Sequence, residues 1–137
     1  MNSRTPARPW RPRQGARRES ARLILSEVPR IAAGAPFVLT GDFNCTREDA
    51  AYLALVSGGG GGALLRDARD LAAPPPYGPP ASFNGFRAEP PAGLPIDHIF
   101  VGPSAVVARA GILPATWAGR FVSDHNPVLA EIRLAPR

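Results

Sequence analysis

Three short polar motifs at the ends of apolar segments constrain this chain more than any other feature of its sequence. They are Gly41-Asp42-Phe43-Asn44, Ile96-Asp97-His98-Ile99-Phe100 and Ser123-Asp124-His125-Asn126-Pro127-Val128. Side chains alternate between the two faces of an extended strand, so Asp42 and Asn44 point the same way, while Asp97 is the one acid in an apolar strand. The motifs therefore predict carboxylate, amide and imidazole groups gathered at one edge of a sheet.

Two helices are expected before the second motif. Apolar residues recur at helical spacing over residues 16–33, which predicts an amphipathic helix that Pro29 ends or kinks. A second helix is expected to begin near Thr46, which can cap it, and to stop at Ser57. The glycine run that follows, residues 58–62, predicts a flexible loop.

Strands make up most of the rest of the chain. A buried strand is expected over residues 36–44, where it runs into the first motif. Further strands are expected over residues 95–101, 105–112 and 127–134, with a short helix or strand over 64–71 and a Pro-rich loop over 72–80. Asn84-Gly85 indicates a turn. The order of helix, strand, helix and then mostly strands predicts a layered α/β or α+β domain.

Basic charge is concentrated at the N-terminus. Residues 1–22 hold seven arginines and one acid, whereas the remaining chain has nine arginines and ten acids, and lysine is absent. Residues 1–14, rich in Arg and Pro, are expected to form a disordered arm ahead of a folded part over residues 15–137. The arm has two interpretations: a solvated tail, which the Ala-, Gly- and Pro-rich bias of the whole chain favours, and a segment that contacts nucleic-acid phosphates.

The composition bears on the cellular compartment of the protein more than on its binding partners. No apolar run is long enough to cross a bilayer, and no apolar stretch follows the N-terminal charges as it would in a secretory signal. The single cysteine, Cys45, allows no internal disulfide and is expected to be a small buried residue. These features favour a cytoplasmic location and leave the oligomeric state open.

The residue types in the three motifs suit the hydrolysis of a phosphate ester. Asp42 can deprotonate the attacking water, and Asn44 and a protonated His125 can donate to the phosphoryl oxygens. A hard metal ion held by carboxylates would neutralise further charge. Asp97, on a neighbouring strand, is the candidate for fixing the tautomer of His125 and favouring its charged form.

In this order and spacing, the motifs resemble the three C-terminal motifs of the endonuclease/exonuclease/phosphatase family. The segment at residues 82–86 is also similar to one common in small bacterial members. The resemblance implies a metal-dependent phosphoesterase with the catalytic residues Asp42, Asn44, Asp97 and His125. It implies Mg²⁺ or Mn²⁺ held by Asp124, Asp42 and Asn44, and a phosphate-ester substrate that nucleic acid could supply. The implied fold is part of a four-layer α/β/β/α sandwich.

Several motifs of that family are missing from this sequence. Its members place Asn and Glu metal ligands on early strands and a Thr-His-x-Asp motif before the helix that matches residues 17–33, and none of these is visible here. Residues 15–137 are therefore expected to be the C-terminal part of the domain, left by a truncated gene or a misplaced start codon. Two alternatives to an active enzyme stay open: a catalytically inactive fragment, and a basic nucleic-acid-binding module that uses residues 1–22.

Other chemistries fit the sequence less well. His98 follows Asp97 directly, so a period of two turns it to the opposite face, and it is expected to be structural or surface-exposed. Ser123, Asp124 and His125 are consecutive and cannot readily reach one another as a hydrolase triad. Two histidines and one cysteine without zinc spacing give no zinc site.

Overall fold

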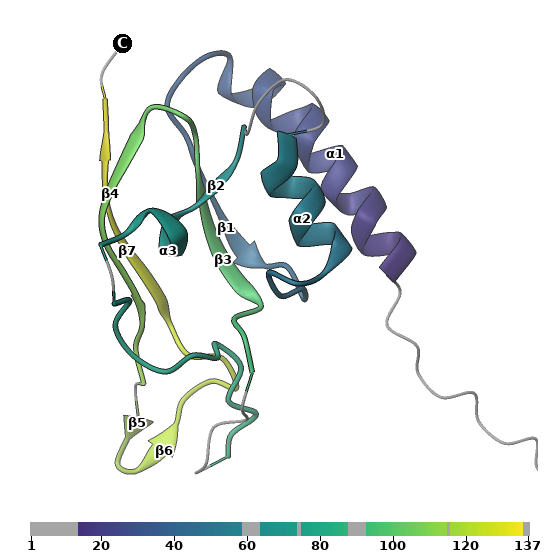
Figure 1. The fold of residues 1–137 in the computed structure, drawn as a ribbon. Helices are drawn as coiled ribbons and strands as arrows, with labels where there is room; N and C mark the ends of the chain where they lie inside the picture. Colours follow the sequence, from purple (N-terminus) through teal and green to yellow (C-terminus); the bar gives the residue numbers. More distant parts are fainter. Residues whose placement is uncertain (1–13, 59–63, 74, 88–92, 115, 136–137) are drawn as a thin grey trace, which may run out of the picture.

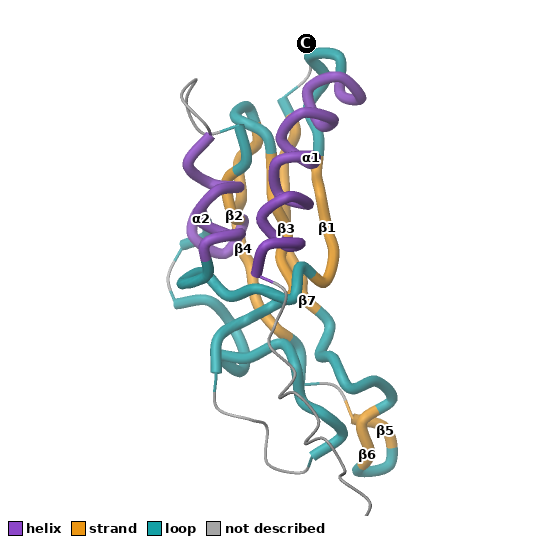
Figure 2. Tube along the Cα trace, turned by 90° about the vertical axis from the view of Figure 1, so that its right-hand side faces the viewer, coloured by secondary structure: helices purple, strands orange, loops and turns teal. Residues whose placement is uncertain are grey.

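The described part of the chain folds into three layers. In the computed structural model, two helices cover one face of a three-stranded sheet, and a two-stranded sheet packs against the other face (Figures 1 and 2). The structure describes residues 14–58, 64–73, 75–87, 93–114 and 116–135. The predicted arm at residues 1–14 lies outside the described residues except for Gln14. Residues 59–62 of the predicted glycine loop also lie outside them.

Helix α1, Gln14–Ala32, confirms the predicted amphipathic helix. Its apolar face packs on the core through Ala21, Ile24, Leu25 and Val28. Of the two expectations for Pro29, that it ends the helix is wrong, because the helix continues to Ala32, and a kink at Pro29 stays a prediction. The helix ends where Ala33 and Gly34 take left-handed φ angles of 48° and 81°. No helix in the described ranges is long and apolar enough to span a membrane.

Helix α2, Ala50–Ser57, confirms the second predicted helix, and it ends at Gly58 with a φ of 71°. Its start differs from the prediction, because Asp49 and not Thr46 is the N-cap residue. The Oδ2 of Asp49 accepts hydrogen bonds from the main-chain N and the Oγ1 of Thr46, at 2.8 and 3.1 Å. The two side chains therefore close a turn ahead of the helix instead of capping its first amides.

Three strands form the central antiparallel sheet, in the order β1-β3-β2. They are β1 (Val38–Asp42), β3 (Asp97–Val101) and β2 (Arg66–Asp67). β2 leads directly into helix α3, Ala68–Leu71, so the segment predicted as a helix or a strand contains both. The fully buried side chains of Phe100 and Leu65 lie in the core cluster that joins this sheet to α1 and α2.

The second sheet pairs β4 (Ala105–Ile112) with β7 (Val128–Leu134), both at their predicted positions. A register shift between Val107 and Arg109 interrupts the ladder. A second core cluster between the two sheets contains Val107, Ala110, Ala130 and Ile132, packed with Ala68, Ile99 and Val101. The short strands β5 (Thr116–Trp117) and β6 (Arg120–Phe121) form a separate antiparallel pair.

The first motif strand is less buried than predicted. β1 lies at the edge of its sheet, and of its residues only Leu39 packs on the core, while Val38, Thr40 and Asp42 are exposed. The reason is that the two-stranded sheet packs mainly against β3 and α3. The face of β1 that points away from the helices is therefore open, and the polar end of the strand is accessible.

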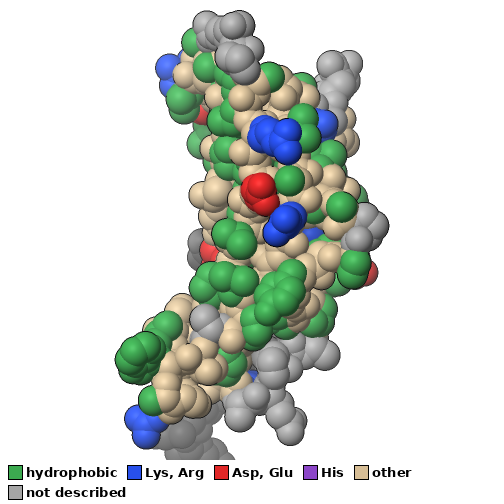
Figure 3. All heavy atoms as spheres, turned by 90° about the vertical axis from the view of Figure 1, so that its left-hand side faces the viewer, with side chains coloured by type: hydrophobic (Ala, Val, Ile, Leu, Met, Phe, Trp, Pro, Cys, Tyr) green, Lys and Arg blue, Asp and Glu red, His purple; other side chains and the backbone are tan. Residues whose placement is uncertain are grey.

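The outer face of the two-stranded sheet carries exposed apolar side chains (Figure 3). Val106 on β4 is 62% exposed and Leu129 on β7 is 54% exposed. Within the described ranges no helix covers this face. The chain therefore supplies three of the four layers expected for the α/β/β/α sandwich.

A glycine in the Pro-rich loop allows that loop to dock on β4. Tyr77 donates its main-chain N–H to the oxygen of Ala110 (3.2 Å) and accepts from the N–H of Ile112 (2.9 Å). Gly78, next in the chain, has a φ of 87°, and a Cβ built on it would lie 1.7 Å from the main-chain oxygen of Ile112.

We expect Gly78→Ala to lower the free energy of unfolding by about 2 kcal/mol or more, because neither the backbone angle nor the contact with Ile112 can be relieved cheaply. Urea unfolding followed by circular dichroism measures the loss. Gly93→Ala is the control, because no atom lies within 4 Å of a Cβ at that position. Equal unfolding midpoints for the two variants would contradict the docking of this loop on β4.

Candidate functional site

The pairing of β1 with β3 places two of the predicted carboxylates opposite each other. Asp42, the last residue of β1, is the register partner of Asp97, the first residue of β3. Directly opposed side chains lie close together in an antiparallel pair, and like charges in that position repel. The arrangement is therefore favourable only if a cation or hydrogen-bond donors lie near both carboxylates.

Asn44 holds the carboxylate of Asp42 from within the same loop. Its main-chain N–H donates to Oδ1 of Asp42 (2.8 Å), and its Nδ2 donates to Oδ2 (3.1 Å). Strand alternation, the predicted cause of this proximity, is not the cause, because β1 ends at Asp42. Asn44 instead has a φ of 50°, in the left-handed region that asparagine adopts more readily than most residues. The turn orients both carboxylate oxygens.

His125 contacts Asp97 across a long stretch of sequence. Its Nδ1 lies 2.8 Å from Oδ2 of Asp97, and its ring packs edge-on against Phe83 with centroids 5.2 Å apart. The hydrogen bond to Asp97 is the main cause that raises the pKa of His125 above its ordinary value, and the charges of Asp97, Asp42 and Asp124 add to the effect against a lowering by burial. The charged imidazolium is thus favoured at this position.

Asp42, Asp97 and His125 can each direct one ligand atom to a common point, because these atoms all lie within 4.8 Å of one another. All three line a groove of about 500 Å³. The hydrogen bond between Asp97 and His125 alone accounts for the closeness of that pair. The β1–β3 register brings Asp42 beside this pair, so the three residues form a possible cation site, and their carboxylate oxygens are ligands of the kind that Mg²⁺ and Mn²⁺ prefer.

A buried serine ties the third motif to the second. The Oγ of Ser82 accepts hydrogen bonds from the main-chain N–H groups of Ile96 (3.0 Å) and Asp97 (3.1 Å). Its main-chain oxygen accepts from the N–H of Asn126 (2.7 Å). Ser82 therefore joins the start of β3 to the loop that carries His125.

A buried asparagine continues this connection. The Nδ2 of Asn84 donates to the main-chain oxygen of Ser123 (3.1 Å) and to Oδ1 of Asn126 (3.0 Å). Ser82 and Asn84 are both 0% exposed, so each of these polar groups depends on its protein partners. We define Ser82, Asn84 and Asn126 as the polar clamp.

The predicted turn after Asn84 is present, one residue later than a turn centred on Asn84-Gly85. The residues with positive φ are Gly85 (60°) and Phe86 (58°), and Arg87 N–H donates to the oxygen of Asn84 at 3.2 Å. The turn adds two hydrogen bonds beside the clamp, because the main-chain N–H groups of Asn84 and Gly85 donate to the main-chain oxygen of Asp124, at 2.7 and 3.0 Å.

Asp124 enters the site mainly through its backbone. Its main-chain oxygen accepts the two hydrogen bonds from the turn. Its carboxylate is not part of the converging group of Asp42, Asp97 and His125. Its charge nevertheless helps to raise the pKa of His125. Metal binding by Asp124 stays a prediction.

His98 lies on the opposite face of β3 from Asp97, as the alternation predicts. Its side chain is buried in the aromatic cluster formed with Phe43, Tyr52 and Phe100. Of the two expectations for this residue, the structural one is confirmed and the surface-exposed one is wrong. Cys45 is 1% exposed, which confirms that it is a buried residue.

The polar clamp was not predicted from the sequence. Asn84 stood out as part of a turn, Ser82 only as part of the segment 82–86 that resembles small bacterial family members, and Asn126 only as part of the third motif. Their side-chain partners lie 14 to 42 residues away in the chain, so no local pattern identifies them. Small polar residues beside Phe83, in a segment bounded by prolines and glycines, were the available signal.

A family profile gives the first comparison with known proteins. The profile described as "Endonuclease/Exonuclease/phosphatase family" matches residues 3–125. No curated protein sequence matches the chain.

Solved structures give the second comparison. An endonuclease/exonuclease/phosphatase family protein from Bacteroides thetaiotaomicron is 35% identical, with a TM-score of 0.76 over 87% of this chain and 44% of that one. A mannosyl-6-phosphatase from B. thetaiotaomicron VPI-5482 is 35% identical, with a TM-score of 0.77 over 88% and 46%. A conserved protein of unknown function from Enterococcus faecalis V583 is 31% identical, with a TM-score of 0.75 over 89% and 46%. The chain thus spans less than half the length of each.

We expect Asp97→Asn to lower the pKa of His125, because it removes the hydrogen-bonded carboxylate that is the main cause of the raised value. Proton NMR of the metal-free chain measures this, since only two histidines contribute imidazole signals. Asp124→Asn should lower the pKa less, because Asp124 acts only through its charge. A larger effect of Asp124→Asn would contradict the assigned pairing.

The same shift predicts how stability depends on pH. Because the pKa of His125 is raised in the folded chain, the pair with Asp97 stabilises the fold most fully below the ordinary pKa of histidine. That contribution is lost as the pH rises through the raised value. Urea unfolding midpoints across this pH window should fall more in the wild type than in Asp97→Asn.

We expect Ser82→Ala to destabilise the chain by about 1–3 kcal/mol, because it leaves the buried N–H groups of Ile96 and Asp97 without their acceptor. Urea unfolding measures the loss, and amide hydrogen exchange at Asp97 should become faster. Ser104→Ala, at an exposed position, is the control. An unchanged exchange rate at Asp97 would argue against the clamp.

Proposed function

The chain belongs to the endonuclease/exonuclease/phosphatase family, and on this premise we propose that it forms the phosphate-binding part of a metal-assisted phosphoesterase. Such an enzyme hydrolyses a phosphomono- or phosphodiester with an activated water. The observation that carries the proposal is the convergence of Asp42, Asp97 and His125, from three separate segments, on one accessible groove.

Asp42 is the residue that we assign to the attacking water. Its carboxylate lies exposed at the end of β1, so water can reach it, and Asn44 fixes both of its oxygens. A carboxylate held in this way can accept a proton from water and aim the resulting nucleophile at phosphorus. Asn44 is its companion and the candidate donor to a phosphoryl oxygen.

His125 is the residue that we assign to the phosphate. Its Nδ1 is engaged by Asp97, which leaves Nε2 as the nitrogen available to a ligand in the groove. The raised pKa of His125 favours the imidazolium, which donates a charge-assisted hydrogen bond to a phosphoryl oxygen. Toward the phosphate, Asp97 acts through His125, by fixing its tautomer and orientation.

The residues present fit a divalent cation. The carboxylates of Asp42 and Asp97 are opposed across two strands, and a cation held between them would relieve their repulsion. We propose Mg²⁺ or Mn²⁺ at this position, with Asp42 and Asp97 as ligands and Asn44 and Asp124 as further candidates. When bound, the ion supplies charge neutralisation for the phosphoryl oxygens.

The substrate class is proposed from the site and from one relative. The site contains groups for a phosphate and a cation, which any phosphate ester satisfies. A relative at 35% identity is named as a mannosyl-6-phosphatase, which supports a sugar phosphomonoester as the first substrate to test. The nucleic-acid-binding alternative rests on residues 1–22, and residues 1–13 of that segment lie outside the described residues.

We expect the chain to hydrolyse p-nitrophenyl phosphate or bis-p-nitrophenyl phosphate in a Mg²⁺- or Mn²⁺-dependent manner. Asp42→Asn and His125→Ala should each reduce turnover about 100-fold or more, because each removes a group that acts on the reacting atoms. Glu131→Gln, on an exposed part of β7, is the matched carboxylate control and should retain full turnover.

Two outcomes would contradict this proposal in different ways. Turnover that persists in Asp42→Asn and His125→Ala would refute the residue roles. Absence of turnover in the wild type, with Mn²⁺ binding that Asp42→Asn weakens, would favour the alternative of a catalytically inactive fragment that keeps its metal site.

A further inference from the structure

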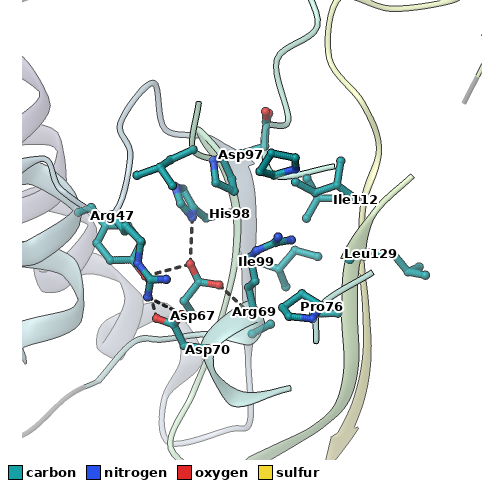
Figure 4. Close-up of a pocket in the computed structure, with 18 residues that line it drawn as sticks. Arg47, Asp67, Arg69, Asp70, Pro76, Asp97, His98, Ile99, Ile112 and Leu129 are labelled. Atoms are coloured by element: carbon teal, nitrogen blue, oxygen red, sulfur yellow. Dashed lines mark hydrogen bonds and ion pairs between the residues drawn. The ribbon is translucent and has the colours of Figure 1, made fainter. Parts of the chain in front are cut away.

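His98 lies buried directly behind the site, and each of its two ring nitrogens has a hydrogen-bond partner. His98 Nδ1 lies 3.0 Å from Oδ2 of Asp67, and its Nε2 lies 2.9 Å from the main-chain oxygen of Cys45. Figure 4 shows the His98 ring directed at the Asp67 carboxylate, with Arg47 and Asp70 beside them. The side chains of His98 and Asp67 are only 4% and 7% exposed, so solvent does not replace either contact.

Both partners of His98 are hydrogen-bond acceptors. Burial raises the pKa of Asp67, but hydrogen bonds from His98, the Arg69 amide and Tyr52 outweigh it, so the pKa lies below its ordinary value and the group is a carboxylate. The main-chain oxygen of Cys45 can only accept. The Nε2 of His98 therefore donates to Cys45, while its Nδ1 contacts the Asp67 carboxylate, to which Tyr52 donates at 3.0 Å.

The bond to Cys45 reaches the loop that forms the site. Cys45 follows Asn44, whose left-handed φ of 50° depends on the path of the chain on either side of it. On the N-terminal side, the N–H of Phe43 donates to the oxygen of Ile96 at 3.0 Å. On the C-terminal side, the oxygen of Cys45 is held by His98. These two bonds bracket Asn44, which in turn orients the carboxylate of Asp42.

We propose that His98 is a positioning residue for the site, acting through the hydrogen bond from its Nε2 to the main-chain oxygen of Cys45. The bond fixes the loop from Asp42 to Cys45, and the loop sets the placement of Asp42 and Asn44. Asp67 and the stacked ring of Phe100 hold the imidazole in the core. This role rests on the proposed function in one respect, because it concerns the same cation and phosphate site.

Two substitutions at position 98 separate the two bonds. In His98→Gln, the side-chain amide nitrogen can reach the place of Nε2 and keep the bond to Cys45. In His98→Asn, the shorter side chain places its amide nitrogen near Nδ1, where it keeps the bond to Asp67 and loses the one to Cys45. Tyr52→Phe is the third variant, because it removes a hydrogen bond to Asp67 and leaves the Cys45 bond in place.

We expect His98→Asn to weaken Mn²⁺ binding about tenfold, as measured by calorimetry, which is typical of the loss of a group that supports metal ligands. His98→Gln and Tyr52→Phe should bind Mn²⁺ within about twofold of the wild type. Urea unfolding of every variant shows whether the substitution has also destabilised the fold. Equal binding by His98→Asn and His98→Gln, or a loss in Tyr52→Phe as large as in His98→Asn, would overturn the proposal.

A metal-free measurement separates this proposal from the proposed function. Amide hydrogen exchange at Asn44 should become at least about tenfold faster in His98→Asn than in the wild type, and should stay near the wild-type rate in His98→Gln and Tyr52→Phe. If the wild type binds no Mn²⁺, the metal assignment fails, and the exchange rates alone decide the role of His98. An unchanged rate at Asn44 in His98→Asn would refute it.

Discussion

The antiparallel register between β1 and β3 is the constraint on which the candidate site depends. Five consecutive pairs fix it, from Val38 opposite Val101 to Asp42 opposite Asp97. A slip of one residue would turn Asp42 toward the helices and bring an apolar residue to the groove, because side chains alternate along a strand. Burial of Leu39 and Phe100 against α1 and α2 opposes that slip. The packing of the core and the geometry of the carboxylates are therefore set together.

The strand β3 connects two polar networks that face opposite ways. On one face Asp97 meets His125, and the polar clamp brings that histidine from a segment 28 residues further along the chain. On the other face His98 joins Asp67 to the loop after β1. A buried polar group stabilises a fold only when its partners are all in place, so both networks demand one arrangement of the segments around β3. This requirement ties together side chains that are widely spaced in sequence.

Local patterns predicted the elements and the faces of their residues. Alternation separated Asp97 from His98 correctly, and helical spacing located α1, because both periodicities follow from backbone geometry alone. The order and chemistry of the motifs predicted the pairing of Asp97 with His125, but contacts with segments that carry no motif were beyond them: nothing near His98 indicates Asp67, 31 residues away. Local patterns also could not choose between two possible N-cap residues. Thr46 and Asp49 can both cap a helix, and the sequence does not show that the Asp49 carboxylate bonds to Thr46. The exposure of β1 depended on the placement of a sheet that no local signal reveals.

The position of β1 at the border of its sheet has a consequence for the chemistry at its end. Within the described residues, β3 is its one neighbour, so the N–H and C=O groups along its other side set the spacing for any further strand. Because side chains alternate along a strand, a strand that pairs with β1 there would place every second side chain on the same face as Asp42. New ligands for the cation or the phosphate could thus be contributed from that side without any change in the residues already in place.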